Sequence, residues 1–211
     1  NGLPVLKNKR FSGRTVSGKF IHGTDLHSLE RQYHQGVLAI DEGVGKLIKA
    51  LKDTGQYENT LIVFGADQGI AWGQKGFQMK LAPYDGTIRG PLIVSMPKKL
   101  PSGKVCEKPV GGADLVPTFF KAAKLELPWK MHGRDLTPLL NNPEDKSWKS
   151  PLLLAHTGMS FGEDCDEVID MKDDPIYQKQ EVPWWVFLRP DRSKYSRNLF
   201  PGETEDLYDM T

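Results

Sequence analysis

The sequence is short of several features that would assign it to a class of protein at once. Its 211 residues include only two cysteines, Cys106 and Cys165, and these form no CxxC pair, which excludes a zinc ribbon or a dithiol redox motif. A disulfide between the two cysteines and a pair of free thiols are both open. Lysine and arginine total 28 against 27 acidic residues, and this balance predicts no basic surface for nucleic acid.

Long apolar runs and the common catalytic motifs are also missing. No run approaches the ~20 apolar residues that a membrane-spanning helix needs. There is no G-x-S-x-G elbow, no P-loop, and no pair of histidines at the helical spacing of a zinc protease. The first residues do not read as a signal peptide and the first is not methionine, so we expect the chain to be part of a longer protein.

A stripe of apolar residues predicts one long amphipathic helix between about residues 26 and 51. Thr24 or Asp25 can cap its start, and Gly55 stands where a C-cap glycine belongs. Three glycines inside the helix each cost about 1 kcal/mol relative to alanine, and they are tolerable if that face packs tightly against a sheet. These glycines are Gly36, Gly43 and Gly45.

Two short apolar runs, residues 60–64 and 91–96, predict buried parallel strands of an α/β sheet. Asp114 is expected to cap a further helix, with Pro117 in its first turn. Residues 141–150 are polar, and we place a domain boundary there.

This boundary gives an α/β domain over residues 1–140 and a small α+β subdomain over residues 141–211. In the subdomain, a turn at Pro190–Asp191 joins two predicted strands, and an earlier apolar run predicts a third, which together indicate a small antiparallel sheet. The predicted strands are residues 152–155, 184–188 and 194–199.

Asp67 and Gln68 directly follow the first predicted strand, at the end of the strand where ligands of open α/β sheets bind. A carboxylate beside an amide carbonyl supplies hard oxygen ligands, which suit calcium or magnesium. A turn in which Asp67 caps the backbone fits the same residues, so the sequence leaves both a cation site and a structural turn open.

Two basic residues in the segment between the predicted strands are candidates for binding an anion. Lys80 can reach back over the strand ends as a point charge, or it is a solvated surface lysine. Arg89 can hold a substrate oxyanion, or it pairs with a carboxylate such as Asp85.

Six segments resemble motifs of the sulfatase family, within the alkaline-phosphatase superfamily. Each is short, but they follow the family's order over roughly residues 30–210, which makes the resemblance specific. The segments are Gln32–Gly45 (similar to YxxxxxxxDxxvG), Tyr57–Gly69 (ENTlvvFtsDNG), Lys80–Pro91 (KxxxYdgGiRvP), Asp114–Thr118 (DlxPT), His132–Leu140 (GrdLxPLL), and Lys194–Tyr195 with Glu205–Asp209 (KYi…eLYDl).

The resemblance implies a partial alkaline-phosphatase-like fold, with a central, largely parallel sheet flanked by helices and the small antiparallel sheet after it. It implies a sulfuric ester hydrolase in which Asp67 and Gln68 bind Ca²⁺, or Mg²⁺ instead, and Lys80 contacts the substrate sulfate as a catalytic residue. Gln68 departs from the asparagine or histidine of the family pattern, and its amide oxygen stands one methylene further out than that of asparagine. Tyr84 and Arg89 match positions expected to be structural.

Family catalysis uses a formylglycine made within a C/S-x-P/A-x-R motif, and neither Cys106 nor Cys165 begins one. The resemblance therefore implies that the formylglycine lies in an N-terminal half of the same enzyme. That N-terminal half is one expected partner of this chain. The other expected partner is a sulfated small molecule or glycan, and the expected location is periplasmic or secreted.

Two other functions are compatible with the same motifs. One is a phosphodiesterase or phosphonate monoester hydrolase of the same superfamily. The other is a non-catalytic, sulfatase-like binding protein, to which Gln68 and Lys75 give some support, since Lys75 stands where many relatives carry histidine.

Overall fold

The structure is a computed structural model, and it describes residues 26–72, 74, 78–80, 82–156, 184–199 and 205–210. The chain divides into two compact units, Asn1–Leu92 and Ile93–Thr211. This division falls earlier than the boundary expected at residues 141–150, which stays a prediction. No helix in the described ranges is both long enough and apolar enough to cross a bilayer.

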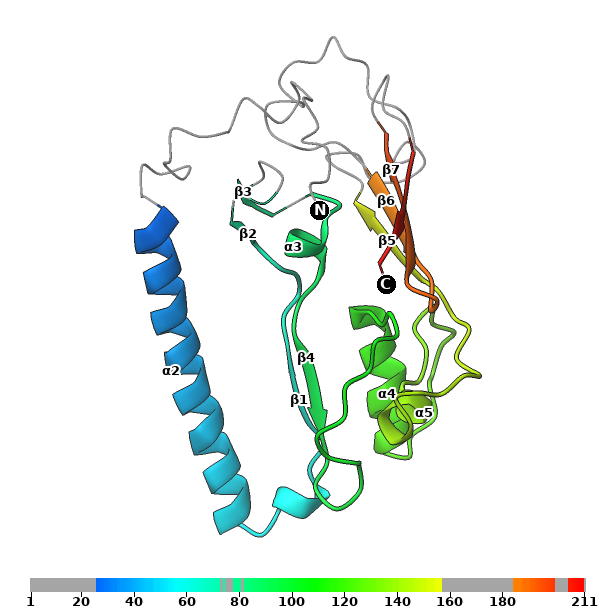
Figure 1. The fold of residues 1–211 in the computed structure, drawn as a ribbon. Coiled ribbons are helices and arrows are strands. Elements are labelled where there is room, and N and C mark those ends of the chain that lie inside the picture. The colour runs from blue at the N-terminus through cyan, green and yellow to red at the C-terminus, as the bar shows by residue number, and fades with distance from the viewer. Residues whose placement is uncertain are drawn as a thin grey trace. The chain divides into compact units, whose positions relative to one another are not determined.

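The predicted long helix is confirmed as α2, Leu26–Asp53, a continuous 28-residue helix in the first unit (Figure 1). Gly55 ends it as expected, with a φ of 69° that favours glycine and with its N–H donating to the Lys52 carbonyl. The expected caps Thr24 and Asp25 lie outside the described residues. Nothing described lies within 4 Å of a Cβ built on Gly36, Gly43 or Gly45, so the tight packing that would make these glycines tolerable is not seen in this part of the chain.

A short 3₁₀ helix, Tyr57–Asn59, leads from α2 to strand β1, Ile62–Gly65, which pairs with β4, Leu92–Ser95. The Ala66 N–H donates to the Pro91 carbonyl at 3.3 Å, so the end of β1 lies beside the start of β4. This pair therefore runs in opposite directions, contrary to the parallel pair expected from the apolar runs. A central parallel sheet is not seen among the described strands.

Between β1 and β4 the chain forms a small hairpin and one helical turn. Strands β2, Ala71–Trp72, and β3, Gln78–Met79, pair antiparallel with Ala71 opposite Met79. Helix α3, Asp85–Ile88, follows, and Ala71 and Ala82 form a small buried core against which Tyr84 packs. The Tyr33 and Trp72 rings meet edge to face at 4.9 Å, which joins α2 to the hairpin.

The helices of the second unit are α4, Leu115–Ala122, and α5, Thr137–Asn141, preceded by a 3₁₀ turn at Gly112–Asp114. Asp114 does precede α4, but its side chain makes no hydrogen bond to the first turn of that helix. Its carboxylate instead accepts hydrogen bonds from the Gly111 N–H and from Arg134. The prediction of a side-chain cap at Asp114 was therefore wrong, because the arginine 20 residues later takes both carboxylate oxygens.

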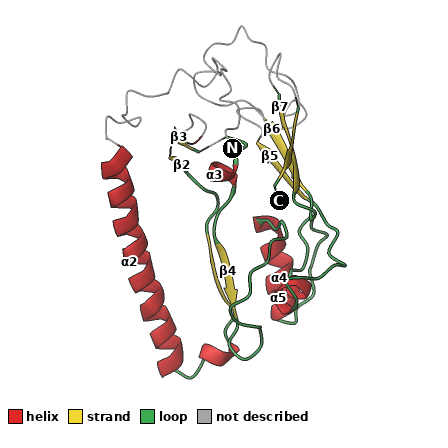
Figure 2. Cartoon of the chain, in the orientation of Figure 1, coloured by secondary structure: helices red, strands yellow, loops and turns green. Residues whose placement is uncertain are grey.

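The predicted small antiparallel sheet is confirmed in the second unit, with the order β5-β6-β7-β8. Figure 2 labels its strands β5, β6 and β7. Its ladder sets Leu154 opposite Val186, which in turn is opposite Ser196. Val186 is fully buried because one face of this sheet is covered. The strands are β5, Leu152–His156, β6, Trp184–Leu188, β7, Ser193–Asn198, and β8, Asp206–Asp209.

Candidate active-site fragment

The candidate residues Asp67, Gln68 and Lys80 come together through the hairpin that follows β1. Asp67 and Gln68 lie two and three residues beyond the end of β1, and Lys80 comes directly after β3. Because β2 and β3 run antiparallel, the chain returns to the end of β1 after the hairpin. The hairpin thus brings a lysine back to a carboxylate that lies far from it in sequence.

The three side chains meet around one oxygen of Asp67. The Lys80 Nζ lies 3.9 Å from Asp67 Oδ2, and the Gln68 Nε2 lies 3.5 Å from the same oxygen. Asp67 has 78% of its side chain exposed, and Lys80 has 44%. Ion pairs this exposed contribute only about 0–1 kcal/mol, so the Asp67–Lys80 pair can open for a ligand at little cost.

The loop that carries Asp67 is held against α3 at close range. The Gly69 N–H donates to the Thr87 carbonyl at 2.8 Å. A Cβ at Gly69 would stand 2.5 Å from the Gly86 carbonyl oxygen and 2.6 Å from the Arg89 carbonyl oxygen, so only glycine fits there without a backbone shift. Gly69, the last residue of the Tyr57–Gly69 motif, therefore fixes the position of the loop.

Thr87 is a supporting residue that the sequence analysis did not single out. It is 2% exposed, and its hydroxyl donates to the carbonyl oxygens of Ala82 and Tyr84. These bonds close the turn after Lys80 and orient the carbonyl that receives the Gly69 N–H. Its place in the Lys80–Pro91 motif was visible, but a threonine between two predicted strands gives no sequence signal of burial.

The two structural positions of this segment differ in what they contact. Tyr84 packs against the small core, as expected. Arg89 is exposed, and its backbone N–H donates to the Asp85 carbonyl at 3.1 Å. No ion pair joins the Arg89 side chain to Asp85 in the described structure.

The donor chemistry at Asp67 and Gln68 fits part of a hard-cation site. One carboxylate and one amide oxygen are ligands that calcium and magnesium accept, but calcium takes about six to eight oxygens. No group of three or more His, Cys, Asp or Glu side chains with metal-binding geometry occurs among the described residues. Asp67 and Gln68 can therefore hold one side of a cation, and further ligands have to come from elsewhere. The amide of Gln68 has to turn its oxygen toward the cation, because its nitrogen now faces Asp67.

Comparisons with known proteins give the family. A family model described as Sulfatase matches residues 5–125, more than half of the chain, and the chain therefore belongs to the sulfatase family.

One similar relative is the N-acetylglucosamine-6-O-sulfatase of Bacteroides thetaiotaomicron, 34% identical over 127 residues, which cover 60% of this chain and 23% of the relative. Among solved structures, BT4656 in complex with its substrate D-glucosamine-2-N,6-O-disulfate is similar with a TM-score of 0.66 and 26% identity, over 82% of this chain and 32% of that one. The phosphonate monoester hydrolase SpPMH from Silicibacter pomeroyi is similar with a TM-score of 0.63 and 26% identity, over 81% and 32%.

The chain spans about a quarter to a third of the length of these proteins. Its fold is thus a portion of the sulfatase fold.

Proposed function

We propose that this chain is part of a metal-dependent sulfatase, which cleaves a sulfate ester at a site to which Asp67, Gln68 and Lys80 contribute. The observation that carries the proposal is the meeting of these three side chains, with the Lys80 Nζ 3.9 Å from Asp67 Oδ2, in a chain of the sulfatase family. A carboxylate and an ammonium group side by side provide one position for a cation and one for an anion.

Each residue has a separate role in the proposed site. Asp67 binds the cation through its carboxylate, and Gln68 adds an amide oxygen after its amide group rotates. Lys80 leaves Asp67 and neutralises one oxygen of the sulfate group, as a flexible point charge does well. Calcium, or magnesium in its place, would supply stabilisation of the negative charge on the sulfuryl oxygens when bound.

The remainder of the catalytic machinery would belong to the rest of the enzyme. We propose that an N-terminal half provides the formylglycine nucleophile and the remaining cation ligands, and that it adds the central, largely parallel sheet. The large uncovered length of the relatives supports this division, since 77% of the first relative lies outside the matched region. The proposed boundary between the catalytic domain and the C-terminal subdomain stays at residues 140 and 141.

The substrate is proposed to be a sulfated sugar or another small sulfate ester. Support comes from the names of the relatives, which include an N-acetylglucosamine-6-O-sulfatase and a structure in complex with D-glucosamine-2-N,6-O-disulfate. A periplasmic or secreted location is proposed with it, and the extracellular sulfatase among the relatives supports that location.

A phosphonate monoester hydrolase is the second candidate, because SpPMH is also similar in structure. Both functions use the same kind of cation and anion positions, so the residues at positions 67, 68 and 80 do not separate them. The two functions are distinguished by the preferred substrate, through its leaving group and through its central atom, which is sulfur or phosphorus.

The experiment compares hydrolysis of an aryl sulfate and a phenyl phosphonate ester by the full-length protein, its Lys80→Ala variant and a Lys46→Ala control. Lys46 is exposed on α2 and pairs with Glu42, so it matches the charge change without touching the site. We expect the sulfate ester to be the better substrate and Lys80→Ala to lower its kcat/KM by about 10²–10³-fold. A higher kcat/KM for the phosphonate ester would favour the second candidate, and no turnover of either would favour a binding protein.

A further inference from the structure

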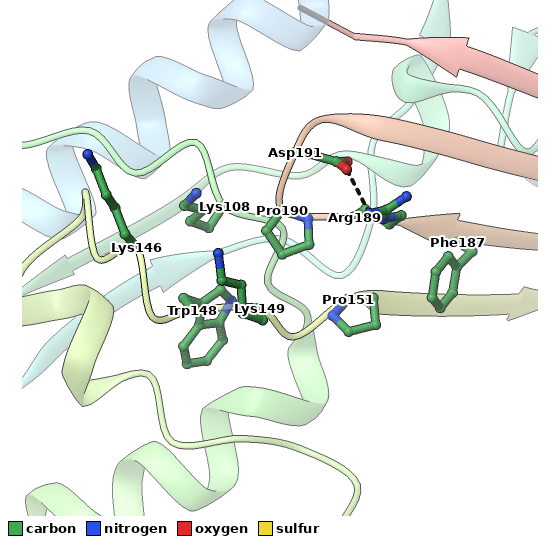
Figure 3. A pocket seen from close by; sticks show the side chains of 9 residues that line it. All are labelled: Lys108, Lys146, Trp148, Lys149, Pro151, Phe187, Arg189, Pro190 and Asp191. Carbon is green, nitrogen blue, oxygen red and sulfur yellow. Dashed lines mark ion pairs between the residues drawn. The ribbon is translucent and has the colours of Figure 1, made fainter.

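A pocket of about 440 Å³ lies in the second unit, between the segment that precedes β5 and the turn that joins β6 to β7 (Figure 3). Its volume is within the range of about 300–1,000 Å³ typical of ligand sites. The lining combines cationic side chains with flat apolar ones. The lysines are Lys108, Lys146 and Lys149, and the flat side chains include Trp148, Pro151 and Phe187.

The pocket carries an excess of positive charge at one end. In Figure 3 the three lysines lie on one side of Pro190, and Arg189 and Phe187 lie on the other. Arg189 is paired with Asp191 at 2.9 Å. Among the described residues, Lys108 interacts electrostatically with the carboxylate of Asp145, but no salt bridge of the three lysines is seen. Three lysines against the one nearby carboxylate of Asp145 leave this end with an excess of positive charge, which a bound anion offsets.

The carboxylate of Asp191 gives the other end a different chemistry. Hydrogen bonds from Ser193, with a smaller contribution from the Arg189 guanidinium, hold the pKa of Asp191 below its ordinary value, so the group is ionised at neutral pH. A carboxylate has about four acceptor positions, and Ser193 and Arg189 do not use all of them. The one acceptor position left by the Ser193 N–H, the Ser193 hydroxyl and Arg189 suits a hydroxyl group of a ligand, and the negative charge disfavours an anionic group at this end.

The floor of the pocket is fixed in place by Arg134. The Arg134 guanidinium lies over the Trp148 ring at 5.1 Å from its centroid and donates to the Pro151 carbonyl at 2.7 Å. Arg134 is itself held by the buried Asp114 at 2.9 Å. Trp148 and Pro151 thus stand on a rigid support, which lowers the entropy lost when a ligand binds.

We propose that this pocket binds a sulfated oligosaccharide, with its sulfate groups at the lysine end and a ring hydroxyl at Asp191. Sugar rings have an apolar C–H face, which can lie on Trp148, Pro151 or Phe187, together with hydroxyl groups that need acceptors. A simple anion would use only the lysines, and nucleic acid would be repelled by Asp191. The pocket lies wholly in the second unit, so binding there does not require hydrolysis at the first unit, but the choice of sulfate as the anionic group rests on the proposed function.

The test titrates a sulfated tetrasaccharide, and its desulfated counterpart, into the full-length protein by calorimetry. All proteins carry Lys80→Ala, which weakens binding at the first unit, and the comparison adds Lys108→Ala with Lys149→Ala. We expect this pair to weaken binding of the sulfated ligand by about tenfold, since two charge contacts are removed. The desulfated ligand is expected to bind more weakly than the sulfated one in both proteins.

The matched control replaces Lys104 and Lys130, two exposed lysines of the same unit that do not line the pocket. This control and the charge-preserving pair Lys108→Arg with Lys149→Arg should stay within about twofold of the parent protein. Thermal melting checks that all variants are folded. In proteins with an intact Lys80, aryl sulfate turnover should be the same with and without the Lys108 and Lys149 changes, which separates this pocket from the proposed hydrolytic site.

Several results would overturn the proposal. One is unchanged affinity after the Lys108 and Lys149 replacements, and another is an equal loss in the Lys104 and Lys130 control. A third is equally tight binding of the desulfated tetrasaccharide. If polyglutamate or a single-stranded oligonucleotide binds as tightly, with the same loss in the variant, the pocket is a general anion site instead of a saccharide site.

Discussion

At the scale of single residues, the buried Asp114 carboxylate joins two segments of the second unit, its own loop from Gly111 and the segment around Arg134. It is 2% exposed and accepts hydrogen bonds from the Gly111 N–H, the Arg134 N–H and the Arg134 guanidinium. Burial, the largest influence, raises the pKa of Asp114, but the bonds from Arg134 and Gly111 and the charge of Arg134 outweigh it and leave the pKa lowered. The group is therefore a paired, ionised carboxylate that organises the backbone around it.

Replacing Asp114 with asparagine should destabilise the protein by about 3 kcal/mol, because the partly buried Arg134 guanidinium loses its counter-charge. Chemical denaturation of the full-length protein measures the effect. Glu126→Gln is the control, since Glu126 is exposed in the same unit. A change at Asp114 no larger than the control would contradict this role.

The lowered pKa also sets the direction of a pH dependence. The stabilisation from ionised Asp114 is complete above the ordinary value of 3.8 and is lost as the pH falls through the lower folded-state pKa. The difference in unfolding free energy between the parent protein and Asp114→Asn should therefore be constant near neutral pH and shrink in acid. A difference that grows on acidification would mean that the sign of the pKa shift is wrong.

At the scale of elements, two motif segments are joined by backbone contacts that leave no room for a side chain. The Thr118 hydroxyl of α4 accepts the Leu136 N–H at 2.9 Å, next to the Asp114–Arg134 pair. A Cβ on Gly133 would stand 1.8 Å from the Ala113 carbonyl oxygen. The Asp114–Thr118 and His132–Leu140 motifs thus pack directly against each other and stabilise the second unit.

Gly133→Ala should lower the free energy of unfolding by more than about 2 kcal/mol, since the new methyl group overlaps a backbone carbonyl. Gly112→Ala is the matched control, because nothing lies within 4 Å of a Cβ at Gly112. It should change stability by no more than about 1 kcal/mol. Thermal melting of both variants in the full-length protein measures the difference. Equal melting temperatures would contradict the close packing of the two motif segments at Gly133.

The helices and strands were predictable where regularly spaced apolar residues or a turn sequence mark them. The apolar stripe and Gly55 predicted α2, and the two predicted strands joined by a turn at Pro190–Asp191 predicted the antiparallel sheet of the second unit. The relative direction of β1 and β4 was not predictable, because a short apolar run has the same appearance in parallel and antiparallel strands. The partner of Asp114 was hidden because a capping residue and a buried ion-pair residue share the same local sequence.

The candidate site was predictable only in part. The sequence named Asp67, Gln68 and Lys80, and the structure brings them together. The roles of Gly69 and Thr87 depend on distances between backbone atoms of different segments, which no sequence pattern carries. Lys75 and Cys165, which bear on the rival functions and on a disulfide, lie outside the described residues, while Cys106 is a free, exposed thiol.

At the scale of the whole molecule, α2 leaves a row of apolar side chains open to solvent within the described structure. Tyr33, Val37, Ile40 and Leu47 of the apolar stripe are all about half exposed or more. An amphipathic helix gains most of its stability from burying such a face. We expect the proposed N-terminal half to cover this stripe in the intact enzyme.

Leu47→Asp should therefore destabilise the full-length protein by about 3 kcal/mol, because it places a charge in the covered stripe. Leu38→Asp is a closely matched control. Leu38 and Leu47 lie on the same helix with 69% and 67% exposure, but Leu38 stands outside the stripe. Chemical denaturation should show no more than about 0.5 kcal/mol for Leu38→Asp, and equal effects of the two changes would mean that the stripe is not covered.

The most direct test of the central claim, that Asp67 forms part of a cation site, is calorimetric titration of calcium into the full-length protein. The titration compares the parent with Asp67→Ala and with Asp53→Ala, a control that removes an exposed carboxylate from the end of α2. The account predicts calcium binding in the parent and in Asp53→Ala, and a loss of at least about tenfold in affinity in Asp67→Ala. Equal calcium affinity in all three proteins would contradict it.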